Sequence, residues 1–262
     1  MGSATTRALG ETTALLGTAA GVDLGVSGEL FAAARALADS RQLSGALADA
    51  AASEDSRANV VAAVFAGWHP TTVSLLSSVA RQRWSSEDDL VDAVEELAIR
   101  AAAVAEPSAD VEGELFEVSR IVAANPELEL ALGSRLGEAG VKGELVRSLL
   151  SGRASEATVL IASSVVQRPR ERRVRQLLSR ALRLVADERG RAVAIVHVAV
   201  EPSAEQLGRL TDMLGRRYGT EVALNVVVDP DIVGGLRIEI GDDVIDATVS
   251  SRLNDLRQRL AG

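Results

Sequence analysis

The sequence predicts a mainly α-helical protein with a small α+β domain at its C-terminal end. Three observations predict two tandem helical bundles followed by a short-stranded sheet packed with helices. Apolar residues make up 47% of the 262 residues but aromatic residues only 2%, so the cores must be aliphatic. Apolar residues recur at helical spacing through residues 1–190. From residue 191 the pattern changes to short runs rich in β-branched residues.

An internal repeat occupies the helical part of the chain. Glu29-Leu30-Phe31 recurs as Glu114-Leu115-Phe116, and Gln82-Arg83 recurs as Gln167-Arg168, both at an offset of 85 residues. The same offset relates Leu43 to Leu128, Leu47 to Leu132, Val61 to Val146, Gly67 to Gly152 and Leu75 to Leu160. Chance similarity between two Ala- and Leu-rich segments is the alternative, but the gapless register and the shared polar positions favour a duplicated bundle. The predicted domains are residues 1–105, 106–190 and 191–262.

The clearest helix begins after Ser86. Ser86 and Asp89 have the spacing of a capping box, and acidic residues at 87–89 suit the positive end of the helix dipole. One apolar stripe follows, formed by Leu90, Val91, Val94, Leu97, Ala98 and Ala101. The matching stripe of the second copy, at an offset of 84, is formed by Val174, Leu177, Leu178, Ala181, Leu182 and Val185.

The matching segments differ in charge. Residues 87–117 are strongly acidic, whereas residues 168–191 are rich in arginine. Two solvated faces would explain this difference. The alternative is that the copies diverged to bind different surfaces or to dock against each other, in which case the charges set orientation more than affinity.

Two kinds of residue in the helical part are candidate partner contacts. Trp68 and Trp84 lie in the first copy, where core packing is the plainer role and an interface anchor is the alternative. The basic segment of the second copy adds three candidate partner contacts, Arg172, Arg173 and Arg175.

The C-terminal part reads as alternating strands and helices. Strands are predicted over 193–200, 222–228 and 236–240, and residues 241–243 form a hairpin turn. A helix opens at Ser203, reaches Tyr218 and is ended by Gly219. A final helix begins at Thr248 or Ser250 and places Val249, Leu253, Leu256 and Leu260 on one face.

The run from Val228 to Asp246 closely resembles the signature of the ATP synthase delta subunit family, which includes the mitochondrial oligomycin-sensitivity-conferring protein. The residues that carry this resemblance are Asp229, Pro230, Gly234, Gly235, Ile238, Gly241 and Asp246. Together with the second helical copy, the resemblance covers residues 108–262. The signature is structural: the glycine pair permits backbone angles or close approaches that a Cβ forbids, and the two aspartates can cap nearby amides. A phosphate-binding loop is a poor alternative because the glycine pair opens a strand and no P-loop lysine follows.

The resemblance implies a non-catalytic stator subunit of the F-type ATP synthase that needs no cofactor. It implies that the helical domain binds N-terminal segments of the α subunits and that the C-terminal domain holds the C-terminal end of the peripheral-stalk b subunit. It places the protein at the cytoplasmic face of the bacterial plasma membrane. The extra copy departs from the usual family length, is similar to extensions in actinobacterial delta-like proteins, and leaves open which copy receives the α segment. We expect helix-binding grooves in one or both bundles and no active site.

Composition excludes several other functions. The chain has no cysteine, which rules out disulfides and cysteine-ligated zinc, and its two histidines are far apart in sequence. No apolar run is long enough to span a membrane, and a net charge of −9 argues against general nucleic-acid binding. The alternative function is a helical scaffold or regulatory protein with a delta-like C-terminal domain. Its basic segment at 168–191 would then bind nucleic acid or an anionic membrane.

Overall fold

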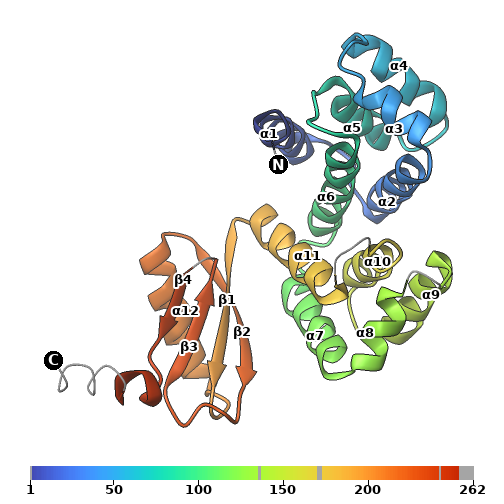
Figure 1. Cartoon of the computed structure of the whole chain (residues 1–262). Helices are drawn as coiled ribbons and strands as arrows, with labels where there is room; N and C mark the ends of the chain where they lie inside the picture. Colours follow the sequence, from blue (N-terminus) through green and yellow to red (C-terminus); the bar gives the residue numbers. More distant parts are fainter. Residues whose placement is uncertain (1, 135–136, 170–172, 242, 254–262) are drawn as a thin grey trace. The chain divides into compact units, whose positions relative to one another are not determined.

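The computed structural model describes residues 2–134, 137–169, 173–241 and 243–253. The protein is mostly helical, with a small four-stranded mixed sheet near the C-terminus, which confirms the predicted fold class. Two compact units are present, residues 1–185 and residues 186–262 (Figure 1). The division of the helical unit into bundles at residue 105 stays a prediction, because both sets of helices belong to the first unit.

The helices of the first unit follow the repeat one by one. They are α1 (Ser3–Thr18), α2 (Leu24–Asp39), α3 (Arg41–Ala48), α4 (Glu54–Val64), α5 (Pro70–Arg81), α6 (Glu87–Ala105), α7 (Val111–Ala124), α8 (Pro126–Gly133), α9 (Ala139–Leu150), α10 (Glu156–Val165) and α11 (Val174–Glu188). Moving α2–α5 by 85 residues along the chain superimposes their bounds on those of α7–α10 to within a few residues.

Equivalent residues of the two copies play equivalent roles. Gly67 and Gly152 both have positive φ, 89° and 71°, in the turns that follow α4 and α9. Glu29 accepts hydrogen bonds from the His69 amide and the Thr72 hydroxyl at the start of α5. Glu114 accepts them from the amide and hydroxyl of Ser155 at the start of α10. The repeated Glu-Leu-Phe therefore ties the second helix of each copy to the N-terminus of the fifth.

Helix α6 belongs to both copies. It ends the first set of helices, but α1 moved by 85 residues also falls within its bounds, so α6 is the first helix of the second set as well. It packs against α1, α2, α3 and α5 on one side and against α10 of the second set. Every residue from Ala93 to Ala103 is buried, so the helix is enclosed on all sides. The sequence predicted a single apolar stripe here, and the additional buried faces follow from the second set of neighbours.

The Ser86 cap is present in a modified form. The Ser86 hydroxyl accepts a hydrogen bond from the Asp89 amide at 3.1 Å, as expected. The Asp89 carboxylate does not return to the cap but accepts from the Thr5 hydroxyl of α1 at 2.9 Å. Asp89 therefore joins α1 to the start of α6.

A buried ion cluster connects α6 with α11. Arg180 of α11 reaches Glu95 at 3.4 Å and Glu96 at 3.2 Å, and Arg100 pairs with Glu96 at 3.0 Å. These side chains are between 8% and 19% exposed. Arg168 also donates to the carbonyl of Ala34 in α2. The opposite charges of the two segments are thus used, at least here, for docking within the helical unit.

One further buried cation recurs at the same place in each copy. Arg57 in α4 is 3% exposed and donates to the backbone carbonyls of Asp49, Ala52, Ala80, Arg81 and Gln82. Its equivalent in α9 is Lys142, which is the chain's sole lysine and donates to the carbonyl of Ser134. Ser134 is itself the equivalent of Asp49, so both cations hold the same loop in their own copy.

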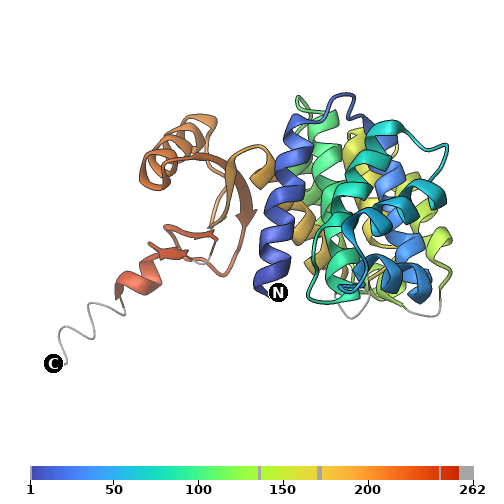
Figure 2. The same cartoon turned by 90° about the horizontal axis from the view of Figure 1, so that it is seen from above.

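The second unit is an α+β module. Its elements are β1 (Arg191–Val198), α12 (Ala204–Tyr218), β2 (Glu221–Val228), β3 (Leu236–Ile240) and β4 (Asp243–Asp246). The strand order is β2-β1-β3-β4, with β1 parallel to β2 and antiparallel to β3. Helix α12 covers one face of the sheet (Figures 1 and 2), where Leu214 packs with Val196, Val222 and Ile238.

The predicted elements of this module are present with small differences. Ser203 forms a capping box with Gln206, and Gly219 ends α12 in the left-handed conformation. The first strand ends at Val198, two residues earlier than predicted, and β4 is an element that the sequence analysis did not name. Residues 249–253 are helical, and the remainder of the predicted final helix lies outside the described residues.

Candidate functional site

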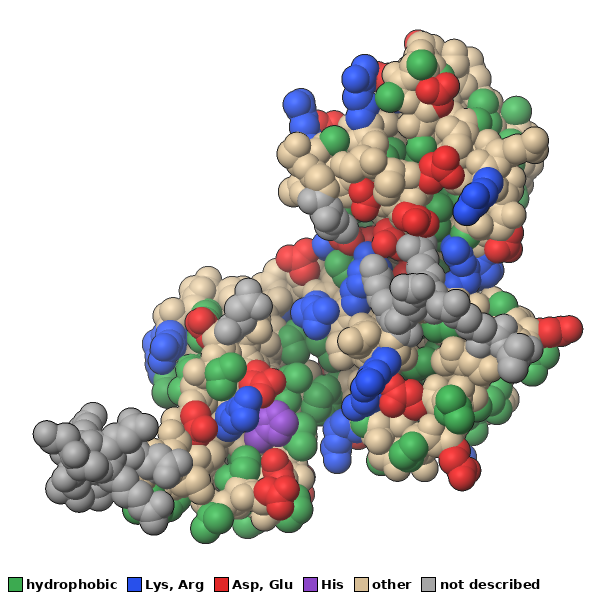
Figure 3. All heavy atoms as spheres, in the orientation of Figure 1, with side chains coloured by type: hydrophobic (Ala, Val, Ile, Leu, Met, Phe, Trp, Pro, Cys, Tyr) green, Lys and Arg blue, Asp and Glu red, His purple; other side chains and the backbone are tan. Residues whose placement is uncertain are grey.

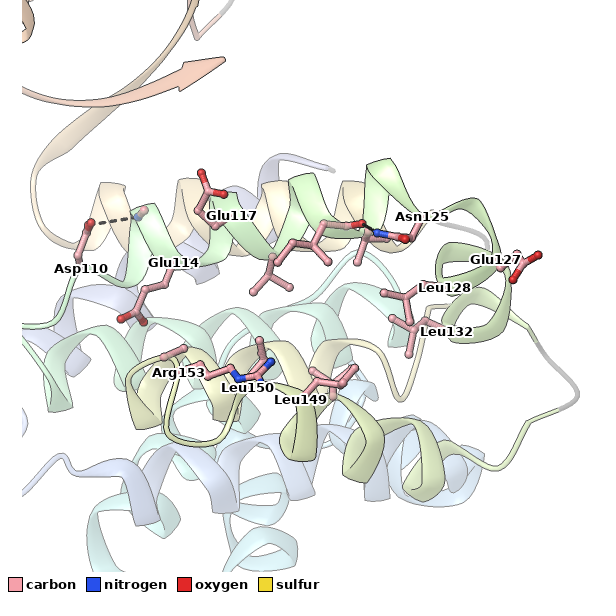
Figure 4. A pocket seen from close by; sticks show the side chains of 16 residues that line it. Asp110, Glu114, Glu117, Asn125, Glu127, Leu128, Leu132, Leu149, Leu150 and Arg153 are labelled. Carbon is pink, nitrogen blue, oxygen red and sulfur yellow. Dashed lines mark hydrogen bonds between the residues drawn. The ribbon is translucent and has the colours of Figure 1, made fainter. Parts of the chain in front are cut away.

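A groove on the second copy is the clearest binding feature of the helical unit. It has a volume of about 780 Å³ and lies between α7 and the end of α9 (Figure 4). Val118, Ile121 and Val122 line it from α7, and Leu149 and Leu150 line it from α9. Leu128 and Leu132 of α8 close one end.

The groove is apolar inside and acidic at its edges. Ile121 and Leu149 are 51% and 44% exposed, an unusual amount for large aliphatic side chains that face each other across a hollow. The lining also includes Asp110, Glu114, Glu117 and Glu127, against the single cation Arg153. Among the described residues, no group of His, Cys, Asp and Glu is arranged to hold a metal ion. The apolar lining suits the binding of an apolar surface.

The signature loop of the C-terminal module is shaped by a close backbone approach. Gly235 has φ 81°, and a Cβ on it would lie 2.3 Å from the carbonyl oxygen of Ala247. The carbonyl of Gly234 accepts a hydrogen bond from the amide of Val249 at 2.9 Å. Ala247 donates from its amide to the carbonyl of Leu236 at 2.9 Å. The glycine pair therefore lets the start of β3 lie directly against the segment that leads into the final helix.

The two signature aspartates cap neighbouring amides. Asp229 accepts from the amide of Asp231 at 3.0 Å within the turn that follows β2. Asp246 accepts from the amide of Thr248 at 2.9 Å and from its hydroxyl at 2.7 Å. These two hydrogen bonds from Thr248 lower the pKa of the Asp246 carboxyl below its ordinary value. Thr248 in turn accepts from the amide of Ser251, so Asp246 orients the residue that starts the helix.

The remaining signature residues are structural as well. Ile238 is 1% exposed and belongs to the core of the module. Gly241 has φ 57° in the turn between β3 and β4. Pro230 lies in the turn after β2.

The described candidate partner contacts of the helical unit lie in different surroundings. Trp84 is 8% exposed, and its Nε1 donates to the carbonyl of Val79. Trp68 is half-buried and stacks edge to face on Phe65, with ring centroids 4.7 Å apart. Arg173 is exposed, and Arg175 pairs with Glu129 of α8 at 3.0 Å. Arg172 lies outside the described residues.

A family model decides the relationship. The model described as "ATP synthase delta (OSCP) subunit" matches residues 97–260, well over half of the chain. The chain belongs to the ATP synthase delta (OSCP) subunit family. The match begins inside α6, which is consistent with α6 being the first helix of the second copy.

The match to relatives in the delta subunit family covers the first copy as well as the second. "ATP synthase subunit delta" of Leifsonia xyli is 44% identical over 100% of both chains. The same-named proteins of Thermobifida fusca and Streptomyces griseus are 41% and 40% identical and cover 89% and 92% of this chain. In solved structures, a chain of the Toxoplasma gondii mitochondrial ATP synthase hexamer covers 64% of this chain at 20% identity, with a TM-score of 0.39. The predicted recognition is confirmed by the family model and by the curated relatives.

The sequence predicts grooves, but the residues that line one were not identified from it. A signal was present in the repeat. Phe65 and Trp68 of the first copy are replaced at the offset of 85 by Leu150 and Arg153, both of which line the groove.

Proposed function

We propose that this chain is the non-catalytic stator subunit of an F-type ATP synthase, where it links the peripheral stalk to the catalytic head and resists rotor torque. Membership of the delta family, with a relative matched over the full length, is the observation that carries the proposal. A stator needs slowly dissociating contacts and no reaction. The apolar groove is consistent with that role.

In this proposal each unit has its own partner. The helical unit receives N-terminal segments of the α subunits, and the C-terminal module holds the C-terminal end of the b subunit. The complex is at the cytoplasmic face of the plasma membrane, and b supplies the anchor. Across the described ranges of the chain, no helix is both long enough and apolar enough to cross a bilayer.

The alternative scaffold function has less support because the basic segment is partly used internally. Arg175 and Arg180 pair with glutamates of the helical unit, and Arg168 donates to a carbonyl of α2. On the face that Figure 3 shows, acidic and basic side chains are interspersed over the molecule. Binding to DNA or to anionic vesicles is therefore expected to be negligible at physiological salt.

The proposal is tested by coupling in a reconstituted ATP synthase. Membranes carrying the complex are prepared with and without this chain, and ATP hydrolysis and ATP-driven proton pumping are measured in parallel. We expect hydrolysis to continue without the chain and pumping to be lost, because the head turns with the rotor. Adding the purified chain should restore pumping. Pumping that is undiminished without the chain would contradict the stator role.

A further inference from the structure

We infer that the groove between α7 and α9 is a docking site for a basic amphipathic helix of a partner, and that this site belongs to the second copy. The inference rests on the proposed function only in taking that helix from another ATP synthase subunit.

The lining fits the apolar face of a helix. Val118 and Ile121 line the hollow from α7. Leu149 and Leu150 line it from α9, and Leu132 lies at its end (Figure 4). Ile121 and Leu149 remain about half exposed, so the apolar surface is available to a partner. An amphipathic helix presents apolar side chains at i, i+3, i+4 and i+7, and such a stripe would fill the space between two helices.

The first copy carries two aromatic rings at positions equivalent to lining residues of the groove. Its equivalents of Leu150 and Arg153 are Phe65 and Trp68, whose rings stack at a centroid distance of 4.7 Å. Phe65 is only 2% exposed, so its ring is packed inside the bundle. In the second copy a leucine and an arginine take the places of these two rings, and both line the hollow of about 780 Å³. The two copies therefore differ in helix-binding capacity although their helices correspond.

Charged residues at the edge of the groove indicate which charge the bound helix should carry. Asp110, Glu117 and Glu127 are exposed carboxylates around the apolar lining, and Arg153 is the one cation among the described residues that line it. Glu117 pairs with Arg120 at 3.1 Å on the surface, where an ion pair contributes little. A helix flanked by lysine or arginine would meet complementary charge along this rim, whereas an acidic helix would be repelled.

The test uses the full-length chain and a designed probe. The probe is an 18-residue helical peptide with leucine at i, i+3, i+4 and i+7 and lysine on the flanks, and a second peptide carries glutamate in place of lysine. Calorimetry should show saturable binding of the lysine peptide and at least tenfold weaker binding of the glutamate peptide. The double variant Leu150→Phe/Arg153→Trp, which rebuilds the aromatic pair of the first copy, should weaken binding of the lysine peptide at least tenfold.

Two controls separate groove filling from other effects. Leu145→Phe/Arg147→Trp makes the same two changes on exposed positions of α9 outside the groove and should leave binding unchanged. Glu117→Gln/Glu127→Gln preserves side-chain shape and should weaken binding several-fold, so the inference is testable even if the aromatic variant fails to fold. Absent binding of the lysine peptide, or equal binding by the groove-filled variant and its control, would overturn the inference. The peptide assay contains no ATP synthase, so its outcome does not decide the stator proposal. A failed coupling assay would likewise not decide whether the groove binds a helix.

Discussion

At the scale of single residues, the signature of the C-terminal module fixes the backbone conformation through a close approach and hydrogen bonds. Gly235 and Asp246 contact the same short segment, residues 247–248, from two directions: the glycine by close approach and the aspartate by two hydrogen bonds. That segment leads directly into the helical residues 249–253. The signature therefore specifies how the chain leaves the sheet and enters its last helix.

Gly235→Ala should destabilise the C-terminal module by about 3 kcal/mol, because it adds a left-handed backbone cost to a clash with backbone atoms that cannot move aside. Hydrogen exchange of β3 and β4 at increasing urea measures the effect. Gly208→Ala in α12 is the matched control: its Cβ would meet nothing within 4 Å, and a helical Gly→Ala change stabilises by up to about 1 kcal/mol. Equal urea midpoints for the two variants would contradict the role assigned to Gly235.

Asp246 should make the stability of the module depend on pH in the acid range. Its pKa is lowered in the folded state by hydrogen bonds from Thr248, so the stabilisation is fully present above the unfolded pKa of about 3.9. It is lost as the pH falls through the lower, folded value. The urea midpoint of wild type should therefore exceed that of Asp246→Asn at pH 6, and the difference should shrink below about pH 4. A difference that grew on acidification would have the wrong sign for this linkage.

At the scale of secondary-structure elements, α6 is the helix on which the whole helical unit depends. It is buried on all sides and carries three charged residues, Glu95, Glu96 and Arg100, into the interior. Arg180 of α11 completes their charge balance. Burial of charge is tolerated only when the partners are in place, because desolvation is costly and the attraction must offset it.

Arg180→Met should lower the free energy of unfolding of the helical unit by about 3 kcal/mol, since it leaves buried glutamates without this cation. Tryptophan fluorescence in urea reports on this unit because both tryptophans lie in it. Arg183→Met on the same helix removes an exposed arginine and should change stability by less than about 0.5 kcal/mol. If both variants unfolded at the same urea concentration, the ion cluster would not be a stabilising feature.

At the scale of the whole molecule, the shared helix α6 makes the two copies one compact unit instead of two separate domains. A boundary at residue 105 separates the sequence repeats. It also separates α6 from the second set of helices, although α6 packs on α10 and pairs with α11. The finer domain division can therefore be tested by cutting the chain on either side of α6.

A fragment covering residues 87–185 should fold, whereas residues 106–185 should not, because only the longer fragment contains α6. Circular dichroism should show a cooperative unfolding transition for 87–185 and little helix for 106–185, since short helices without a packed face are marginal in water. Residues 1–105 contain all six helices of the first set and should fold as well. A stable, cooperatively unfolding 106–185 fragment would support the boundary predicted from sequence and argue against a shared helix.

Sequence by itself determined most of the local structure. The helices of the repeat, the Ser203 and Gly219 caps and the three predicted strands depend on periodicity and on residues adjacent in the chain, so a single sequence carries that information. The signature run was likewise sufficient for the family, because its glycines and aspartates act on neighbours within about 20 residues.

Only the tertiary structure decided which surfaces are covered and which are open. The complete burial of α6, the pairing of Arg180 with glutamates 84 and 85 residues away, and the open groove beside Leu150 all depend on neighbours that are distant in sequence. Periodicity shows that a helix has an apolar face, but it does not show how many partners the helix has. Whether two facing helices meet or leave a groove depends on the volumes of side chains from several elements at once, and that sum exists only in the folded molecule.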